Sequence, residues 1–241
     1  MDVFDDLAAE HALLDAVLGA LTDREWAAPS AADGWSVTDV VLHLAQTEEL
    51  VLASVTGDDD RFTRDATPLD AVMDAAVAAE RGAAPADVLD RWRTASRQSL
   101  GALRSCAPSA RLAWAAAPLS PRTLATTRLA EHWTHALDIA GPLGIAYPDT
   151  SRLRHVAWLA HRTLPYAFAL AGRDAGPVRC ELTAPDGAPH VFGADAPSVV
   201  RGPLGDFCRV AARRLTVEDS ALTAEGPDGE AALHTVRTYA A

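Results

Sequence analysis

Hydrophobic residues recur at intervals of three and four along most of the first 172 residues, the period of a helix with one buried face. The first run covers residues 3–21 and places Leu7, Leu14 and Leu18 on one side. The same pattern predicts further helices over residues 36–55, 69–81, 85–103, 122–140 and 151–171. Residues 57–68 are charged and rich in turn-forming types, which predicts a loop.

The pattern changes after Gly172. Residues 178–183 alternate between hydrophobic and polar positions, and turn-forming residues at 185–187 lead into a second short strand over 189–192. Further strands are predicted over 198–201 and 221–224, and helices over 203–213 and 227–239. The sequence therefore predicts a mainly α protein, with a helical bundle over residues 1–172 and a small α+β domain over residues 173–241.

The composition narrows the classes of function. The 241 residues carry a net charge of -12, which disfavours nucleic acid and membrane surfaces as partners because phosphates and anionic lipids would repel the chain. The three cysteines form no CxxC pair, so a thiolate metal site and a disulfide framework are disfavoured. An acidic start and the lack of any run of about 18 uncharged apolar residues predict a cytoplasmic protein.

The predicted helix over residues 122–140 contains a carboxylate and an imidazole one turn apart, Glu131 and His135. Side chains at this spacing project from one face, so the pair can hold a single metal ion. His132 is the rival to His135, but it lies about 60° away from the hydrophobic stripe. Taken alone, such a pair is more often a surface helix pair or a hydrogen-bonded core histidine.

His43 is the candidate for a third ligand. It lies between two leucines of the predicted helix over residues 36–55, where a histidine is usually a satisfied core residue. Yet a zinc site with an open position needs three protein ligands, and facing helices of a bundle commonly supply them. Thr47 or Asp39 is expected to orient the His43 ring, and Trp35 is expected to be a packing anchor more than a platform for substrate.

Two segments resemble a known family. DGWSVTDVVLHL contains His43, LAEHWTHALDIA contains Glu131 and His135, and together they resemble the DinB-like bundle of mycothiol-dependent maleylpyruvate isomerases. The acidic start and the tail from CRVAARRLT to HTVRTYA are also similar, so the resemblance covers nearly the whole chain. It implies a DinB-like four-helix bundle, a sterol-carrier-like C-terminal domain, and zinc or another divalent metal on His43, Glu131 and His135.

The resemblance also implies an enzyme that works with mycothiol, a small thiol. Such an enzyme would isomerise a small electrophilic, anionic substrate or transfer sulfur onto it. The resemblance implies that an arginine of the C-terminal domain holds the anion, for which Arg209, Arg213 and Arg214 are candidates. Arg128, one turn before Glu131, either points into the same cavity or forms a salt bridge with Glu131 or a neighbouring acid.

Two alternatives stay open from the sequence. The same metal site could activate water or polarise a carbonyl without any thiol, as in a hydrolase, lyase or isomerase of specialised metabolism. The metal could also be structural or absent in a non-catalytic binding or regulatory module, because a shared fold never settles function. No pattern encodes the oligomeric state, although bundles of this kind often pair through a helix face.

Overall fold

The structure is a computed structural model that describes residues 2–58, 68–115, 117–174 and 176–239. By their internal contacts, the residues form two compact units, Met1–Tyr147 and Pro148–Tyr239. This division falls earlier than the join near residue 172 that the hydrophobic pattern indicated, because the helices after residue 148 pack on helices near the C-terminus. The loop predicted over residues 57–68 lies largely outside the described residues.

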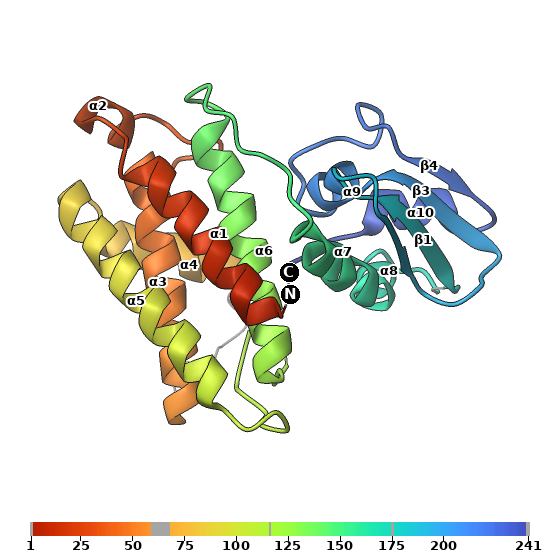
Figure 1. Cartoon of the computed structure of the whole chain (residues 1–241), viewed down its shortest axis with the longest axis horizontal. Helices are drawn as coiled ribbons and strands as arrows, with labels where there is room; N and C mark the ends of the chain where they lie inside the picture. Colours follow the sequence, from red (N-terminus) through yellow and green to blue (C-terminus); the bar gives the residue numbers. More distant parts are fainter. Residues whose placement is uncertain (1, 59–67, 116, 175, 240–241) are drawn as a thin grey trace. The chain divides into compact units, whose positions relative to one another are not determined.

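The first unit contains the helices α1 (Val3–Leu18), α2 (Asp23–Trp26), α3 (Val37–Thr56), α4 (Leu69–Glu80), α5 (Pro85–Ser105) and α6 (Pro121–Ala140). The longest of them, α1, α3, α5 and α6, pack against one another as a bundle (Figure 1). The short helices α2 and α4 lie against α3. The expected four-helix bundle is therefore confirmed.

Local sequence signals define the ends of α3 and α6. Ser36 accepts a hydrogen bond from the backbone N–H of Asp39, and the Asp39 carboxylate accepts one from the backbone N–H of Ser36, which forms a reciprocal cap. α3 ends at Gly57, whose φ of 77° is left-handed and favours glycine. Ser120 caps α6 by accepting from the backbone N–H of Thr123. These caps fix the residue at which each helix begins. They therefore fix the position of the candidate ligands along each helix axis.

The interior of the bundle is hydrophobic around a small group of polar side chains. Its hydrophobic members are at most 1% exposed and include Leu7, Leu14, Val40, Leu44, Trp92, Leu124, Leu129 and Trp133. Burying a side chain of this kind stabilises the fold by roughly 1.5–3 kcal/mol. Glu48, Arg128 and His132 are equally inaccessible, at most 2% exposed, and polar groups so deeply buried need partners.

The second unit joins four helices to a small sheet, in the order α7 (Leu153–Arg162), α8 (Leu164–Leu170), β1 (Val178–Thr183), β2 (Pro189–Phe192), β3 (Ser198–Pro203), α9 (Leu204–Ala211), β4 (Thr223–Glu225) and α10 (Gly229–Thr235). The strand order is β2-β1-β3-β4, with β1 antiparallel to β2 and parallel to β3, and β3 antiparallel to β4. α9 and α10 contact the sheet, α7 packs on α9, and α8 packs on α10. The expected α+β fold of the C-terminal part is confirmed.

The prediction of a single helix over residues 151–171 is wrong. The structure has two helices there, because α7 ends at Arg162 and α8 begins at Leu164 with Pro165 in its first turn. Proline lacks a backbone N–H and its ring clashes with the preceding turn, so it is tolerated at the start of a helix and not inside one. The hydrophobic spacing continues across the break, which explains why the pattern alone did not reveal it.

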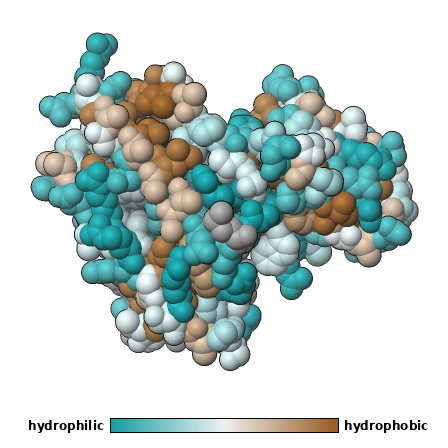
Figure 2. All heavy atoms as spheres, in the orientation of Figure 1, coloured by the Kyte–Doolittle hydropathy of each residue, from teal (hydrophilic) through white to brown (hydrophobic). Residues whose placement is uncertain are grey.

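The surface is consistent with the strongly acidic composition. Figure 2 shows hydrophilic residues over much of the visible face of both units. Among the described residues, the most exposed large hydrophobic side chains lie in the second unit, and they are Trp158, Tyr166, Leu170, Val191 and Tyr239. Among the helices of the described ranges, none combines the length and apolar character needed to cross a bilayer.

Candidate metal centre

α3 and α6 bring together His43, Glu131 and His135, which we call the outer cluster. Nε2 of His43 lies 2.9 Å from Oε1 of Glu131, and Nε2 of His135 lies 3.5 Å from the same oxygen. The two imidazole rings meet edge to face, with their centroids 5.0 Å apart. One candidate ligand atom from each residue lies within 4.8 Å of the other two. The two segments selected from the sequence therefore converge on one point.

The members of the outer cluster differ in exposure. The side chains of His43 and His135 are 6% and 14% exposed, whereas that of Glu131 is 31% exposed. The imidazoles are enclosed by helix packing, and the carboxylate reaches solvent. A molecule from solvent would therefore approach this cluster past Glu131.

Asp138 orients His135. The Asp138 carboxylate is buried, and its Oδ2 lies 2.9 Å from Nδ1 of His135. Because a carboxylate only accepts hydrogen bonds, Nδ1 carries a proton and donates it, which turns Nε2 toward Glu131. A carboxylate in this place commonly fixes the tautomer of a metal-binding histidine. Asp138 was not among the residues predicted from the sequence, although its spacing of three residues from His135 places both on one helix face.

Hydrogen bonds and burial set the charges of the outer cluster. Burial lowers the pKa of His43 despite the opposing hydrogen bond to Glu131, so this imidazole is neutral at neutral pH. Burial also acts to lower the pKa of His135, but hydrogen bonds to Asp138 and Glu131 outweigh it and raise that pKa to about 9. Burial acts to raise the pKa of Glu131, but hydrogen bonds from His135 and His43 outweigh this effect and hold that pKa well below its usual range. An arriving metal cation would displace protons from this cluster.

The outer cluster fits a zinc ion by donor type and spacing. Zinc sites with an open position are built from three protein ligands, and two histidines with one glutamate form such a set. Bonds of about 2.0–2.1 Å at tetrahedral angles place neighbouring donor atoms roughly 3.3 Å apart. The donor distances of 2.9 Å and 3.5 Å lie on either side of that value.

A second group of the same residue types, which we call the inner cluster, consists of His11, Glu48 and His132 and is buried throughout. His132, the rival to His135, faces this group, with its ring centroid 4.4 Å from that of His11. Its Nδ1–H donates to the backbone carbonyl of Arg128 at 2.8 Å, and its Nε2 accepts from the indole N–H of Trp92 at 3.0 Å. Both nitrogens of His132 are therefore occupied, which leaves no lone pair for a metal.

Arg128 pairs with the inner cluster. Its Nε donates to Oε1 of Glu48 at 2.8 Å, and its Nη2 donates to Oγ1 of Thr47 at 2.7 Å. Ser99 donates to the other carboxylate oxygen of Glu48. The side chains of Arg128 and Glu48 are only 3% and 0% exposed. Of the two roles left open for Arg128, the geometry favours the ion pair, with Glu48 as the acid in place of Glu131.

The residues expected to orient His43 have other partners. Thr47 donates its hydroxyl proton to the backbone carbonyl of His43, and the Asp39 carboxylate caps α3 and accepts from Arg81. Among the described residues, Nδ1 of His43 is buried without a hydrogen-bond partner. The ring of Trp35 packs beside this imidazole, 5.0 Å away between centroids. The contact of its Nε2 with Glu131 and the packing of Trp35 therefore orient His43.

Three further arginines considered for substrate binding, Arg209, Arg213 and Arg214, lie in the second unit. Arg209 forms two hydrogen bonds with the carboxylate of Asp149, at 2.9 Å and 2.6 Å. Arg213 has a left-handed φ of 60° and donates to two backbone carbonyls at the end of α10. Arg214 donates to a backbone carbonyl just after α9. A role of Arg213 or Arg214 in binding substrate stays a prediction.

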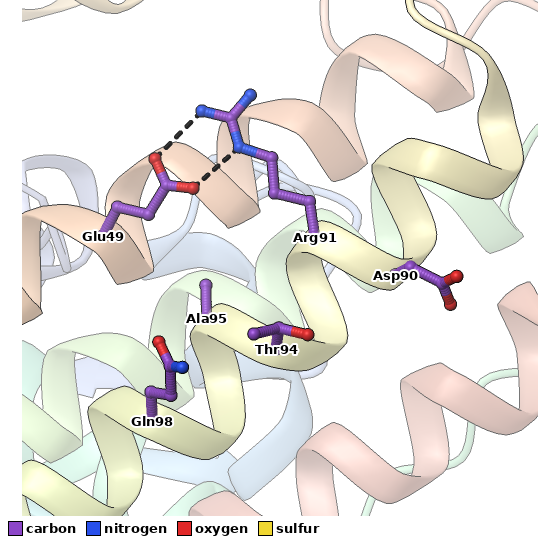
Figure 3. A pocket seen from close by; sticks show the side chains of 6 residues that line it. All are labelled: Glu49, Asp90, Arg91, Thr94, Ala95 and Gln98. Atoms are coloured by element: carbon purple, nitrogen blue, oxygen red, sulfur yellow. Dashed lines mark hydrogen bonds and ion pairs between the residues drawn. The ribbon is translucent and has the colours of Figure 1, made fainter.

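A surface hollow of about 350 Å³ lies between α3 and α5 and is separate from both clusters. Figure 3 shows the Arg91 guanidinium bound by the Glu49 carboxylate beside this hollow. Two hydrogen bonds of 2.7 Å and 2.9 Å join these side chains, and Glu80 accepts a further one from Arg91. The cation that would attract an anionic ligand is therefore already neutralised, and no outer-cluster residue is among the described residues that line the hollow. Its size alone does not mark a functional site.

Comparison with known proteins defines the class to which this arrangement belongs. Residues 7–140 match the family described as the mycothiol maleylpyruvate isomerase N-terminal domain. The match spans nearly the whole bundle, including both clusters, and covers more than half of the chain. The chain belongs to this family.

Individual relatives extend the similarity beyond the bundle. Uncharacterized protein MT0041 of Mycobacterium tuberculosis strain CDC 1551 and Uncharacterized protein Rv0036c of strain ATCC 25618 are each 33% identical over 98% of this chain and 94% of the relative. Crystal structures of the mycothiol-dependent maleylpyruvate isomerase and of its histidine-to-alanine mutant match with a TM-score of 0.63 and 17% identity, over 94% of both chains. At that identity the structural likeness shows a shared fold across both parts of the chain.

Proposed function

We propose that this chain is a zinc-dependent enzyme that uses mycothiol to isomerise, or to transfer sulfur onto, a small electrophilic and anionic substrate. The observation that carries the proposal is the convergence of His43, Glu131 and His135, with donor spacings that suit zinc and an approach from solvent past Glu131. Membership of the mycothiol maleylpyruvate isomerase family supports the choice of thiol and of reaction class.

The residues of the outer cluster each have a defined task in this proposal. Asp138 keeps a proton on Nδ1 of His135, so that Nε2 faces the metal position. Glu131 is ionised and His43 is neutral, so a dication on these ligands would leave a net positive site. A zinc ion bound there would lower the pKa of a thiol at its open position, which makes a thiolate available at neutral pH. The positive site would also attract an anionic substrate.

The proposed isomerisation needs no oxidant or reductant. A thiolate at the open position would supply reversible addition to a conjugated cis double bond, with the π electrons taken up by the neighbouring carbonyl group. Loss of the same thiolate after rotation would return the electrons, give the trans isomer and regenerate the thiol. Sulfur transfer would instead end at the adduct, after a proton has been taken up on carbon.

Metal analysis combined with activity assays tests this function. The purified protein is expected to bind one zinc per chain and to convert maleylpyruvate, or to consume mycothiol in the presence of a related electrophile, only when metal and thiol are both present. Turnover that continues undiminished after removal of every low-molecular-weight thiol would favour the thiol-independent zinc enzyme. A protein that binds no divalent metal would overturn the proposal.

A further inference from the structure

We infer that Trp35 forms a wall of the ligand position beside the outer cluster and selects ligands with a planar, unsaturated group next to the atom that binds the metal. This inference rests on the proposed function, because it requires a metal on His43, Glu131 and His135. It adds a substrate class to that function, namely molecules whose reacting part is flat.

Trp35 lies beside both imidazoles of the outer cluster. Its ring centroid is 5.0 Å from that of His43, with the planes tilted by 51°. Its centroid is 6.3 Å from that of His135, with the planes only 23° apart. Both separations fall in the range of interacting aromatic pairs. The indole therefore borders two of the three donor groups.

Packing alone does not account for the placement of Trp35. Trp26, Trp92 and Trp133 are 5%, 1% and 1% exposed, as expected for side chains that fill the core. Trp35 is only partly buried. The ring lies beside a cluster whose carboxylate also reaches solvent. A molecule that approaches past Glu131 would therefore meet this ring.

Hydrogen bonds on both sides hold the ring in place. The indole N–H donates to Asp74 of α4 at 3.0 Å, and the backbone carbonyl of Trp35 accepts from the Ser30 hydroxyl at 2.8 Å. In the same loop, the N–H of Ala31 donates to the backbone carbonyl of Asp138 at 2.9 Å, which fastens the loop to α6. Since Asp74 occupies the polar N–H, the remaining surface of the ring is hydrocarbon and π face.

A fixed π surface favours a flat partner over a saturated one of equal charge. Pairing with an aromatic ring adds roughly a factor of two to ten in affinity beyond the effect of buried area. A conjugated double bond and its neighbouring carbonyl are coplanar, whereas the saturated analogue has tetrahedral carbons and is not planar. Trp35 would therefore favour the unsaturated substrates to which a thiolate can add.

The test uses the full chain loaded with cobalt(II) and two thiols of matched size, phenylmethanethiol and cyclohexylmethanethiol. Each thiol releases its proton to solvent as it binds, and the thiolate–cobalt absorption reports its dissociation constant. The preference for the flat thiol, measured as the ratio of the two constants, is expected to fall about two- to tenfold in Trp35→Leu. Trp35→Phe, which keeps an aromatic face, is expected to retain most of it.

A second pair of variants leaves the ring itself in place. Asp74→Ala removes the hydrogen-bond acceptor of the indole and is expected to lose part of the preference. Asp70→Ala removes an exposed carboxylate one turn earlier on α4 and is expected to change nothing. An unchanged preference in Trp35→Leu contradicts the inference, and so does an Asp74→Ala protein that behaves like Asp70→Ala. Wild-type protein that binds no cobalt contradicts the proposed function instead, so the two failures are distinguishable.

Discussion

The bundle contains two His–Glu–His clusters of opposite character. In the outer cluster, both imidazoles turn Nε2 toward one oxygen of Glu131, and that carboxylate is 31% exposed. In the inner cluster, Glu48 and His132 are 0% exposed, and their polar atoms are taken by Arg128, Ser99 and Trp92. Helices α3 and α6 contribute to both clusters.

The difference shows what separates a metal site from a structural polar core. Both clusters have ligand-type side chains within reach of one another, so residue types and spacing do not discriminate them. A metal also needs lone pairs without a competing donor and a position that solvent can reach. In the outer cluster, the donors to Glu131 are the two candidate histidine ligands themselves, whose protons a metal would displace, and Glu131 reaches solvent. The inner cluster instead neutralises a buried cation and ties helices together through Glu48 and His132, although Nε2 of His11 is buried without a hydrogen-bond partner among the described residues.

The largest expected effect is on the inner cluster. Arg128→Met should lower the free energy of unfolding by about 3–5 kcal/mol, because it leaves the Glu48 carboxylate buried without its cation. Urea unfolding measures the loss. The double variant Arg128→Met with Glu48→Gln removes both charges and should recover much of the stability. A single variant as stable as the wild type would show that the ion pair is not structural.

Ligand removal separates the two clusters directly. His43→Ala removes one of the three candidate ligands and should weaken zinc binding by more than ~100-fold. That factor is the upper end of the loss expected when a residue that only hydrogen-bonds a ligand is removed. His11→Ala, which removes the corresponding imidazole of the inner cluster, should leave one zinc per chain. Competition with a chromophoric chelator gives both affinities. Loss of zinc in the His11 variant but not in the His43 variant would reverse the assignment.

Removal of the side chain that orients His135 should weaken zinc binding less than removal of a ligand. Asp138→Ala removes the carboxylate that accepts from Nδ1 of His135 and should weaken zinc binding by about 10–100-fold. The same chelator competition applies. Asp15→Ala, which removes a half-exposed carboxylate paired with Arg93 on the bundle surface, serves as the control and should keep the wild-type affinity. Equal affinities in the two variants would exclude an orienting role for Asp138.

Two buried serines on α5 provide the finest test of the inner cluster. Ser99→Ala removes a donor to Glu48 and should cost about 1–3 kcal/mol of unfolding free energy. Ser96 is also buried, but among the described residues its hydroxyl has no hydrogen-bond partner, so Ser96→Ala should be nearly neutral or stabilising. Neither variant should alter zinc binding. Equal losses in the two would mean that helix packing, and not the Glu48 network, determines the effect.

Much of the fold was predictable because helix periodicity and capping are local. The helical runs fall where the hydrophobic spacing placed them, and Ser36 and Gly57 begin and end α3 as cap residues do. The break at Pro165 was not predicted, because hydrophobic residues continue on both sides of it. The short α2 was also missed, since a helix of one turn carries too few positions to show a period.

The candidate ligands were predictable only in part. Spacing along α6 and the resemblance to a family pointed to His43, Glu131 and His135, which the structure brings together. The partner of Arg128 was not predictable, because Glu48 lies 80 positions away and nothing in α6 specifies it. The wall formed by Trp35 depends in the same way on a loop that is tied to both α4 and α6.

The sequence by itself indicated most of the helical segments, the approximate starts of α3 and α6, and which side chains along them are of types that can bind a metal. The tertiary structure supplied the neighbours of His132 and His135. These two histidines lie three residues apart on one helix, yet after packing His132 contacts Trp92 and His135 contacts Glu131. The tertiary structure also pairs Arg128 with Glu48 and leaves Trp35 only partly buried. Periodicity and capping act within a few residues, whereas burial and lone-pair availability arise only where distant segments meet.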